Sequence, residues 1–522
     1  MIKGSKDIGM LKAINRNIIL ALAAVWGFTV SCSQAYPGLD YDKGDEITNT
    51  ETYDKTPIMV FVNEQYFFSI SSTRSSGTGA FTEYAKGDKK KYNNSTFYIY
   101  AFRAGADSQG GPFGGTEPDL RKSFFALGHE RDKENTSCLV DGPDYDFGMP
   151  TRPNTDGVGA LEPYLSEGSG SVLGEDNGIY YSSVHHETGY NFFAYFVDNL
   201  DAPEYRGTKC IPHRESKDMI WYDLTIDGTQ DIMCGYAPRL TKQRLDDKYK
   251  NANIKNKEDR EKIERIGGYS TFAAHRGVYP IVEMKHRLSQ FRFRAFPGEP
   301  SADSILITAV KMKGWDRGRM VVAATNKDTA SIGFTPYTDG QKTDLMLRDT
   351  LVFNDDGTPD ECPPLGMSVS YDYDEYKKFK EDNPLNMGYM TKRWRNEWKN
   401  LAWNQRDNID VGGSLMLFPD SVYEVTLEYR QLLRNGRIQD LKAVYRLTAE
   451  QGAAANPSGY LRDEKTGRWM FRAGKYYTMN IAVYGLQPII VVAEIDNWDS
   501  GGDIPIEPDD PDYNDNTGMG RN

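Results

Sequence analysis

The sequence predicts a mainly β protein, and three observations lead to this fold class. Tyr and Phe account for 33 and 23 of the 522 residues, and aromatic side chains suit the half-buried face of a sheet. Short apolar segments recur along the chain between clusters of Gly, Pro, Asn and Asp. Apolar and polar residues alternate over 290–296, as in a strand with one buried face. We therefore expect two β-sandwich domains with loop and helical insertions.

The first 31 residues predict an export signal. Their apolar core is too short to cross about 30 Å of hydrocarbon as a permanent helix. The basic residues around its start are Lys3, Lys6, Lys12 and Arg16. Thr29-Val30-Ser31-Cys32 resembles a bacterial lipobox, whose cysteine is acylated, for example with palmitate, and becomes the first residue of the mature chain. We expect residues 1–31 to be removed and Cys32 to hold the protein on a membrane. The alternative is a buried free cysteine that ends a core segment.

The charge of the chain argues against nucleic-acid binding. Its formal net charge is −13 and its pI about 5.2, whereas a phosphate backbone requires a concentrated basic face. The remaining cysteines lack the spacing of zinc ligands, and we predict no cofactor. An exported compartment permits disulfides, so a bridge between Cys210 and Cys234 and free thiols both stay open. These cysteines are Cys138, Cys210, Cys234 and Cys362.

The first predicted domain covers residues 57–279 and follows a polar, acidic tether at 32–56. It opens with a strand at 57–70 that is apolar on both faces. An exposed loop of small residues follows at 71–79, and proteases prefer such loops. The other elements expected here are strands at 96–102 and 190–197 and an exposed helical insertion of mixed charge at 241–265.

The second predicted domain covers residues 280–498. Its first strand presents two different faces, since Phe291, Phe293 and Ala295 lie on one and Gln290, Arg292 and Arg294 on the other. The strands expected in this domain are 281–296, 304–310, 414–418, 422–429, 476–483 and 489–495. Residues 499–522 are rich in Gly, Pro and Asp, and we expect them to be disordered.

Several short motifs follow one another along the chain in a distinctive order and spacing. They are the lipobox at Cys32, Thr73-Arg74, Gln230-Asp231-Ile232-Met233, Met284-Lys285-His286-Arg287-Leu288-Ser289, Gly474-Lys475-Tyr476-Tyr477 and the Ile-rich strand that ends at Trp498. Together they resemble the fimbrillin (type V pilin) family of Bacteroidetes, over most of the mature chain. The resemblance implies a surface-exposed lipoprotein of the cell outer membrane, part of a fimbrium (pilus), built from two transthyretin-like β-sandwich domains.

The resemblance also implies a mechanism of assembly by donor-strand exchange. A trypsin-like protease cuts after an arginine, here between Arg74 and Ser75, and releases the first strand. A strand of the next subunit then fills the groove and regains apolar burial and ladder hydrogen bonds. The displaced strand would contribute Ile58, Val60, Val62, Tyr66, Phe68 and Ile70, and the candidate donor strand Ile489, Val491, Ala493 and Ile495. The alternative is that Arg74 is a solvated loop residue and that the first strand stays in place.

The C-terminal tail departs from the pattern of a shaft subunit. After Trp498 it contains Pro505, Pro508 and Pro511 and lacks alternation, so it is poorly suited to add a strand to a sheet. Together with the long insertions, this favours a tip or accessory component, or a relative that does not polymerise. We expect adhesion, with other pilin subunits and a host or bacterial surface ligand as partners.

Motifs of common enzyme classes are missing from the sequence. It contains no G-x-S-x-G, G-x-x-x-x-G-K-[ST] or H-E-x-x-H pattern, and we predict no catalytic residues and no metal site. His185-His186-Glu187 is the nearest metal-like cluster, but adjacent residues on a strand point to opposite faces. Asn354-Asp355-Asp356-Gly357 fits a hairpin turn better than a calcium loop.

The alternative function is glycan binding by a surface lipoprotein of a polysaccharide-uptake system. Trp394 and Trp398 lie four residues apart and would share one face of a helix, where their rings could stack on sugars. The plainer interpretation is that this face packs onto the sandwich. One variant distinguishes the two functions. If the protein binds glycans, Trp398→Ala should abolish its binding to a polysaccharide.

Overall fold

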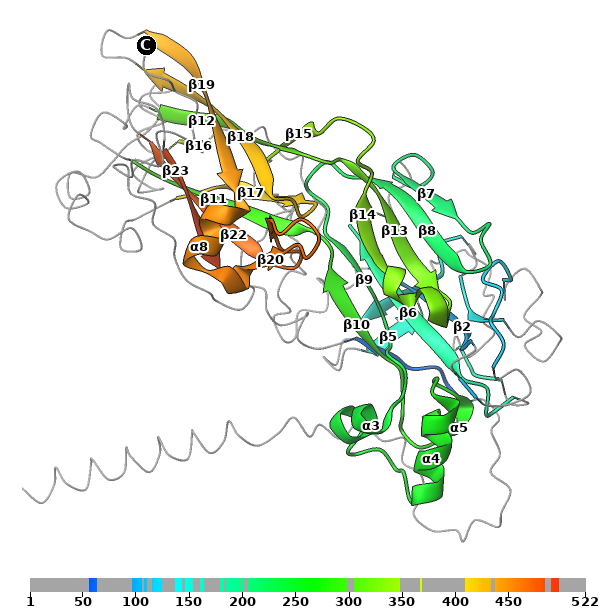
Figure 1. Cartoon of the computed structure of the whole chain (residues 1–522). Helices are drawn as coiled ribbons and strands as arrows, with labels where there is room; N and C mark the ends of the chain where they lie inside the picture. Colours follow the sequence, from blue (N-terminus) through cyan, green and yellow to red (C-terminus); the bar gives the residue numbers. More distant parts are fainter. Residues whose placement is uncertain are drawn as a thin grey trace, which may run out of the picture.

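Strands dominate the described part of the chain, as the aromatic-rich sequence predicts (Figure 1). Within these strands, Tyr, Phe and β-branched side chains form three buried clusters. The structure is a computed structural model that describes residues 56–62, 96–105, 108–109, 115–123, 137–142, 146–153, 160–163, 179–182, 185–198, 200, 205–297, 305–347, 367–368, 409–432, 437–483 and 490–496.

The largest sheet has eight strands in the order β3-β2-β4-β5-β1-β10-β9-β6, and a further pairing of β6 with β2 closes the path into a ring. The predicted strands at 96–102 and 190–197 are β2 and β6. Both faces of β2 are buried, since Phe97 and Ile99 lie in one core cluster and Tyr98 and Tyr100 in another. The strands of this sheet are β1 (Val60–Val62), β2 (Phe97–Arg103), β3 (Cys138–Val140), β4 (Met149–Pro153), β5 (Ala160–Pro163), β6 (Tyr190–Val197), β9 (Ile232–Tyr236) and β10 (Ile281–His286).

A four-stranded sheet in the order β14-β13-β8-β7 packs on the outer face of this ring through a shared aromatic core. At its centre the hydroxyl of Tyr222 lies 3.1 Å from that of Tyr100 and 2.9 Å from that of Tyr195. The hydroxyls of Tyr100 and Tyr222 also reach the carbonyl of Asp146, and that of Tyr195 reaches the carbonyl of Phe147, so all three buried hydroxyls have hydrogen-bond partners. The elements here are β7 (Cys210–His213), β8 (Met219–Thr225), β13 (Arg317–Ala324), β14 (Gly333–Pro336) and the 3-10 helix η4 (Asn326–Ser331).

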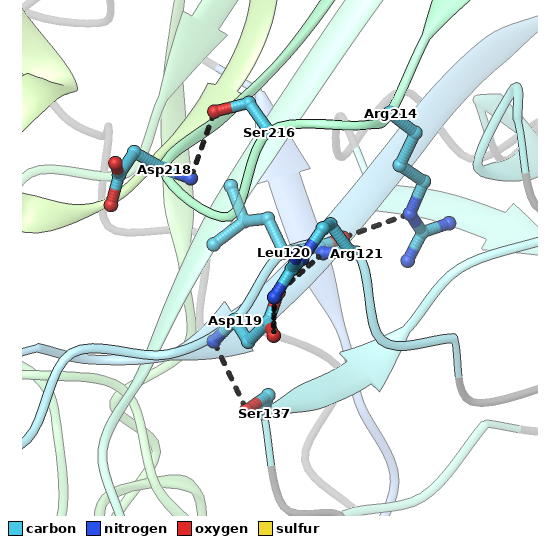
Figure 2. Close-up of polar contacts among 7 residues, drawn as sticks. All are labelled: Asp119, Leu120, Arg121, Ser137, Arg214, Ser216 and Asp218. Atoms are coloured by element: carbon cyan, nitrogen blue, oxygen red, sulfur yellow. Dashed lines mark hydrogen bonds and ion pairs between the residues drawn. The ribbon is translucent and has the colours of Figure 1, made fainter.

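An arginine fixes the connection over residues 115–123 to this part of the fold. Arg214 donates from Nε to the carbonyl of Leu120 at 2.9 Å, and from Nη1 it pairs with Asp141 at 3.0 Å. Figure 2 shows Arg214 directed at Leu120, while Arg121 folds back on Asp119 at the surface. The side chains of Arg214 and Asp141 are 3% and 0% exposed, so their ion pair lies in the interior.

The C-terminal half forms a sandwich of two further sheets around one core cluster. The order is β17-β11-β22-β23 in the first, and β15-β12-β18-β19 in the second, where β16 also pairs with β12. The elements are β11 (Ser289–Pro297), β12 (Ile305–Gly314), β15 (Thr343–Met346), β16 (Met367–Ser368), β17 (Ile409–Leu417), β18 (Val422–Leu432), β19 (Ile438–Thr448), α8 (Ala449–Ala455), η7 (Pro457–Gly459), β20 (Tyr460–Arg462), β21 (Trp469–Phe471), β22 (Tyr476–Val483) and β23 (Ile490–Asp496).

The predicted helical insertion forms α3 (Lys242–Lys248) and α4 (Lys257–Ile266), followed by the short α5 (Thr271–Ala274). Thr241 and Asn256 cap the first two helices, because their side chains accept backbone N–H groups in the first turn. Leu245 and Ile263, two of the few apolar residues of this charged segment, are buried. Figure 1 shows the three helices together beneath β5 and β10, at the end of the molecule away from β19.

The chain passes from β10 to β11 through only Arg287 and Leu288, so the strand predicted at 281–296 is two strands in different sheets. β10 pairs with β1 and β9, and β13 pairs with β8. Strands that follow residue 280 therefore also complete sheets of the N-terminal half. The division into domains at 57–279 and 280–498, and their transthyretin-like topology, stay predictions.

Candidate functional site

Strand β1 fills a slot between β5 and β10 of the eight-stranded sheet. Val60 lies opposite Leu161 of the antiparallel β5, and Val62 lies opposite Val282 of the parallel β10. Both neighbours come from segments far along the chain. Among the described strands, β1 therefore belongs to no hairpin, and only lateral contacts connect it to the strands on either side.

Contacts on the N-terminal side extend the slot beyond β1 itself. Ile58 donates its N–H to the carbonyl of Ile179 at 2.8 Å, and Tyr181 donates its N–H to the carbonyl of Thr56 at 2.9 Å. The hydroxyl of Thr56 lies 2.7 Å from Nε2 of His275, just after α5. The segment 56–62 is thus held from its first described residue onward.

Burial of apolar side chains stabilises the segment that contains β1 in the slot. Ile58, Val60, Phe61 and Val62 are 5%, 1%, 4% and 2% exposed. At roughly 1.5 to 3 kcal/mol for each buried side chain, the four contribute at most about 6 to 12 kcal/mol. Removal of the strand would also leave the edges of β5 and β10 unpaired. The slot can therefore bind an extended apolar segment by strand addition.

The structure describes half of the predicted displaced strand. Ile58, Val60 and Val62 occupy the slot, and all three belong to the same core cluster. The other predicted site residues lie outside the described residues, namely Cys32, Tyr66, Phe68, Ile70, Arg74, Ser75, Trp394, Trp398 and Ile489. The cleavage site, the lipidation site and the glycan platform therefore stay predictions.

The predicted donor segment forms β23, a strand at the edge of its own sheet. It pairs antiparallel with β22, and the register sets Val491, Ala493 and Ile495 opposite Ile481, Met479 and Tyr477 in that order. These three residues of β22 are each 1% exposed and belong to the C-terminal core. In the single chain, the candidate donor strand is therefore already paired.

Three motifs that are far apart in the sequence meet where β10 passes into β11. Asp231 and His286 are both buried and hydrogen-bonded, with 2.9 Å between Oδ1 and Nδ1. Gly474 donates its N–H to the carbonyl of Leu288 at 2.9 Å. The φ of Gly474 is 72°, a left-handed conformation that a residue with a side chain rarely adopts. The sequence indicated each of these motifs, which begin at Gln230, Met284 and Gly474, but not their contact. That contact depends on how the sheets of the N-terminal half join those of the C-terminal half.

A second carboxyl group adjoins this hydrogen bond. Asp198, just after β6, accepts the backbone N–H of Asp231 at 2.8 Å. Burial, and then the nearby charge of Asp231, raise the pKa of the Asp198 carboxyl to about 7. A carboxyl group with a raised pKa favours folding in its protonated form. Its contribution to stability is complete below the ordinary carboxyl pKa and is lost as the pH rises through about 7.

We expect Asp198→Asn to remove this pH dependence, because the amide stays neutral and its oxygen can still accept the N–H of Asp231. Between pH 5 and pH 8.5, the stability of the variant relative to the wild type should rise by about 1 to 2 kcal/mol, allowing for partial exposure of the group. Urea unfolding of both proteins at the two pH values measures this difference. A constant difference between them would show that Asp198 is ionised throughout.

The residues 185–187 form a turn rather than the strand assumed from the sequence, and Thr188 donates its N–H to the carbonyl of His185 at 3.0 Å. Glu187 lies 2.7 Å from Nζ of Lys262 on α4 and 3.6 Å from Nε2 of His186. The Lys262 ammonium lowers the pKa of the Glu187 carboxyl. In the part of the chain that the structure describes, no three His, Cys, Asp or Glu side chains converge as metal ligands.

Cys210 and Cys234 are buried free thiols, which decides against the disulfide considered between them. They lie on β7 and β9, in different sheets. Burial raises the pKa of the Cys210 thiol to about 12. The sulfur of Cys234 accepts a hydrogen bond from Nε of Arg287 at 3.0 Å. Cys362 lies outside the described residues.

Comparison with known proteins gives structural neighbours and no sequence relative. No family model and no curated protein sequence matches the chain. A candidate cell adhesion protein of Bacteroides uniformis aligns at a TM-score of 0.35 and 9% identity, over 86% of this chain and 100% of that chain. The fimbrial anchor protein Mfa2 of Porphyromonas gingivalis aligns at 0.27 and 10% identity, over 85% and 98%. The C-terminally truncated tip fimbrial protein Mfa3 of the same organism aligns at 0.24 and 9% identity, over 84% and 99%.

These neighbours are adhesion and fimbrial proteins. At such low TM-scores, the likeness assigns no role to any residue of this chain. Among the described residues, no helix has the length and apolar character to span a bilayer.

Proposed function

We propose that this protein is a fimbrillin-like lipoprotein of the cell surface that acts in adhesion as a component of a fimbrium. The observation that carries the proposal is the position of β1, a short buried strand between β5 and β10 that belongs to no hairpin among the described strands. The export signal and the lipobox at Cys32 support a location at the outer membrane. The fimbrial neighbours are compatible with the proposal but do not carry it.

The mechanism that we propose is donor-strand exchange at this slot. Cleavage after Arg74 separates the segment that contains β1 from the rest of the chain. The slot then loses its occupant, and the apolar burial and ladder hydrogen bonds of an incoming strand offset the loss. The incoming strand needs apolar side chains at alternate positions to match the sites of Ile58, Val60 and Val62.

The protein would accept a strand more readily than it would donate one. Its candidate donor, β23, pairs with β22 of its own chain, and the tail beyond Trp498 contains three prolines at Pro505, Pro508 and Pro511. A subunit that accepts without donating ends a filament. This supports a tip or accessory role over a repeated shaft unit.

We expect limited trypsin treatment of the folded protein to cut first after Arg74. Because the cut frees β1 from the chain, the product should form ladders that resist SDS or should bind an added strand peptide. N-terminal sequencing of the protein from native cells supplies a second measurement, since Cys32 as the first residue indicates an anchored precursor and Ser75 a processed subunit.

Arg74→Gln should keep the protein monomeric under the same treatment. Arg468→Gln, which removes an exposed arginine of the C-terminal half, is the matched control and should behave as the wild type. A product that is cut after Arg74 but stays a stable monomer, with no affinity for a strand, would contradict the proposed exchange.

A further inference from the structure

The connection between α3 and α4 is basic although the chain as a whole is acidic. Residues 248–257, here called the lysine loop, contain no acidic residue, whereas the net charge of the chain is −13. Its lysines are Lys248, Lys250, Lys255 and Lys257, and all of them are exposed. Lys257 pairs with Glu261 at 3.3 Å, but such a solvated pair is weak and easily exchanged.

Carboxylates at the ends of the lysine loop are partly neutralised by other groups. Asp246 forms an ion pair with Arg260, and Asp259 lies 2.9 Å from Nε of Arg276. Asp247 and Glu258 stay exposed on either side. The four lysines of the loop therefore outnumber the two exposed carboxylates that flank it.

The backbone of the lysine loop is held in place by the core beneath it. Tyr249 is 5% exposed, and its hydroxyl donates to the carbonyl of Tyr279 at 2.6 Å. Asn253 donates its N–H to the carbonyl of Arg276 at 2.8 Å, and Ala252 donates to the carbonyl of Tyr249 at 3.0 Å. The lysines thus project from a preorganised turn, which lowers the entropy cost of binding.

The lysine loop lies beside the place where the chain arrives from its predicted lipid anchor. Thr56, the first described residue, contacts His275, and the next residue, Arg276, accepts the N–H of Asn253 in the loop. Only residues 33–55 separate Thr56 from Cys32. A random coil of this length would span roughly 25 to 30 Å on average, so an anchor at Cys32 would keep this end of the molecule close to the bilayer.

We propose that the lysine loop docks on the phosphate-bearing, anionic head groups of the membrane that holds the lipid anchor. The proposal rests on the lipoprotein nature of the proposed function. Each lysine close to an anionic bilayer raises the affinity by about fivefold, which gives several hundredfold for the four together at low salt. Docking would set the helical end of the protein against the membrane and direct the C-terminal sandwich away from it (Figure 1).

The test is lysine acetylation, read by mass spectrometry, of the full protein purified from native cells and mixed with vesicles. Vesicles of phosphatidylcholine containing phosphatidylglycerol should slow the labelling of the loop lysines by about tenfold or more relative to pure phosphatidylcholine. High salt should restore the labelling, because it screens the attraction. Exposed lysines elsewhere should label equally in both, namely Lys209, Lys217, Lys327 and Lys465.

Lys255→Gln with Lys257→Gln should restore the labelling of Lys248 and Lys250 in the anionic vesicles. Lys217→Gln with Lys327→Gln removes the same charge elsewhere and should leave the protection intact. Equal labelling in both kinds of vesicle would overturn the proposal, as would protection by inorganic phosphate alone, which would indicate a site for a free anion. The intact mass of the purified protein reports acylation of Cys32 separately. The absence of a lipid anchor can therefore be distinguished from the absence of docking by the lysine loop.

Discussion

Replacement of Val60 and Val62 together by Asp is expected to lower the free energy of unfolding by about 5 kcal/mol or more. Both side chains are almost fully buried in the slot between β5 and β10, so each change removes apolar burial and places a carboxylate in the core. Urea unfolding measures the loss. Because the substituted β1 fits its slot poorly, the variant should also bind a fluorescent peptide with the sequence of residues 56–62 faster than the wild type does.

Met59→Asp provides the control within the same strand segment, since Met59 is only half-buried. We expect a smaller loss of stability and little peptide binding. If the double variant unfolds as a whole without binding the peptide, β1 is a permanent part of the core and the slot cannot exchange its occupant.

Arg214→Met is expected to destabilise the protein by about 3 to 5 kcal/mol, because it removes the guanidinium that pairs with the buried carboxylate of Asp141. The guanidinium also donates to the carbonyls of Leu120 and Lys122 at 2.9 and 2.7 Å, and both carbonyls would lose a donor. Thermal and urea unfolding measure the effect. The expected loss is large because the ion pair is buried, as the 3% and 0% exposure of its two side chains shows.

Two further variants test whether the loss of stability comes from the buried charge of Asp141. Adding Asp141→Asn to Arg214→Met should recover part of the lost stability, since the uncompensated carboxylate is then gone. Arg121→Met should change stability little, because Arg121 pairs with Asp119 at the surface with 54% of its side chain exposed (Figure 2). Equal effects of Arg121→Met and Arg214→Met would refute the argument from burial.

The sequence predicted those elements whose pattern is local. The aromatic segments at 96–102 and 190–197 are β2 and β6, and the charged segment at 241–265 contains α3 and α4, because continuous apolar residues and helix formers are visible without tertiary information. β8 was missed although its burial alternates along Met219–Thr225. Its outward positions include Trp221, an apolar residue that hides the alternation.

The candidate site could be predicted only as a segment. The apolar residues near position 60 indicated a strand, but not that it lies between β5 and β10 or that it runs parallel to β10. Such pairing depends on contacts between distant residues, which a single sequence does not reveal. The same limit hid the hydrogen bond between Asp231 and His286, which are 55 residues apart in the sequence.

The direct passage from β10 to β11 determines how the protein responds to a pulling force. Arg287 donates its N–H to the carbonyl of Ile232, and Leu288 accepts the N–H of Gly474, each at 2.9 Å. No slack segment lies between the two strands. In the adhesive function that we propose, tension along the molecule would therefore load these hydrogen bonds together, since no loose connection at this point could extend first.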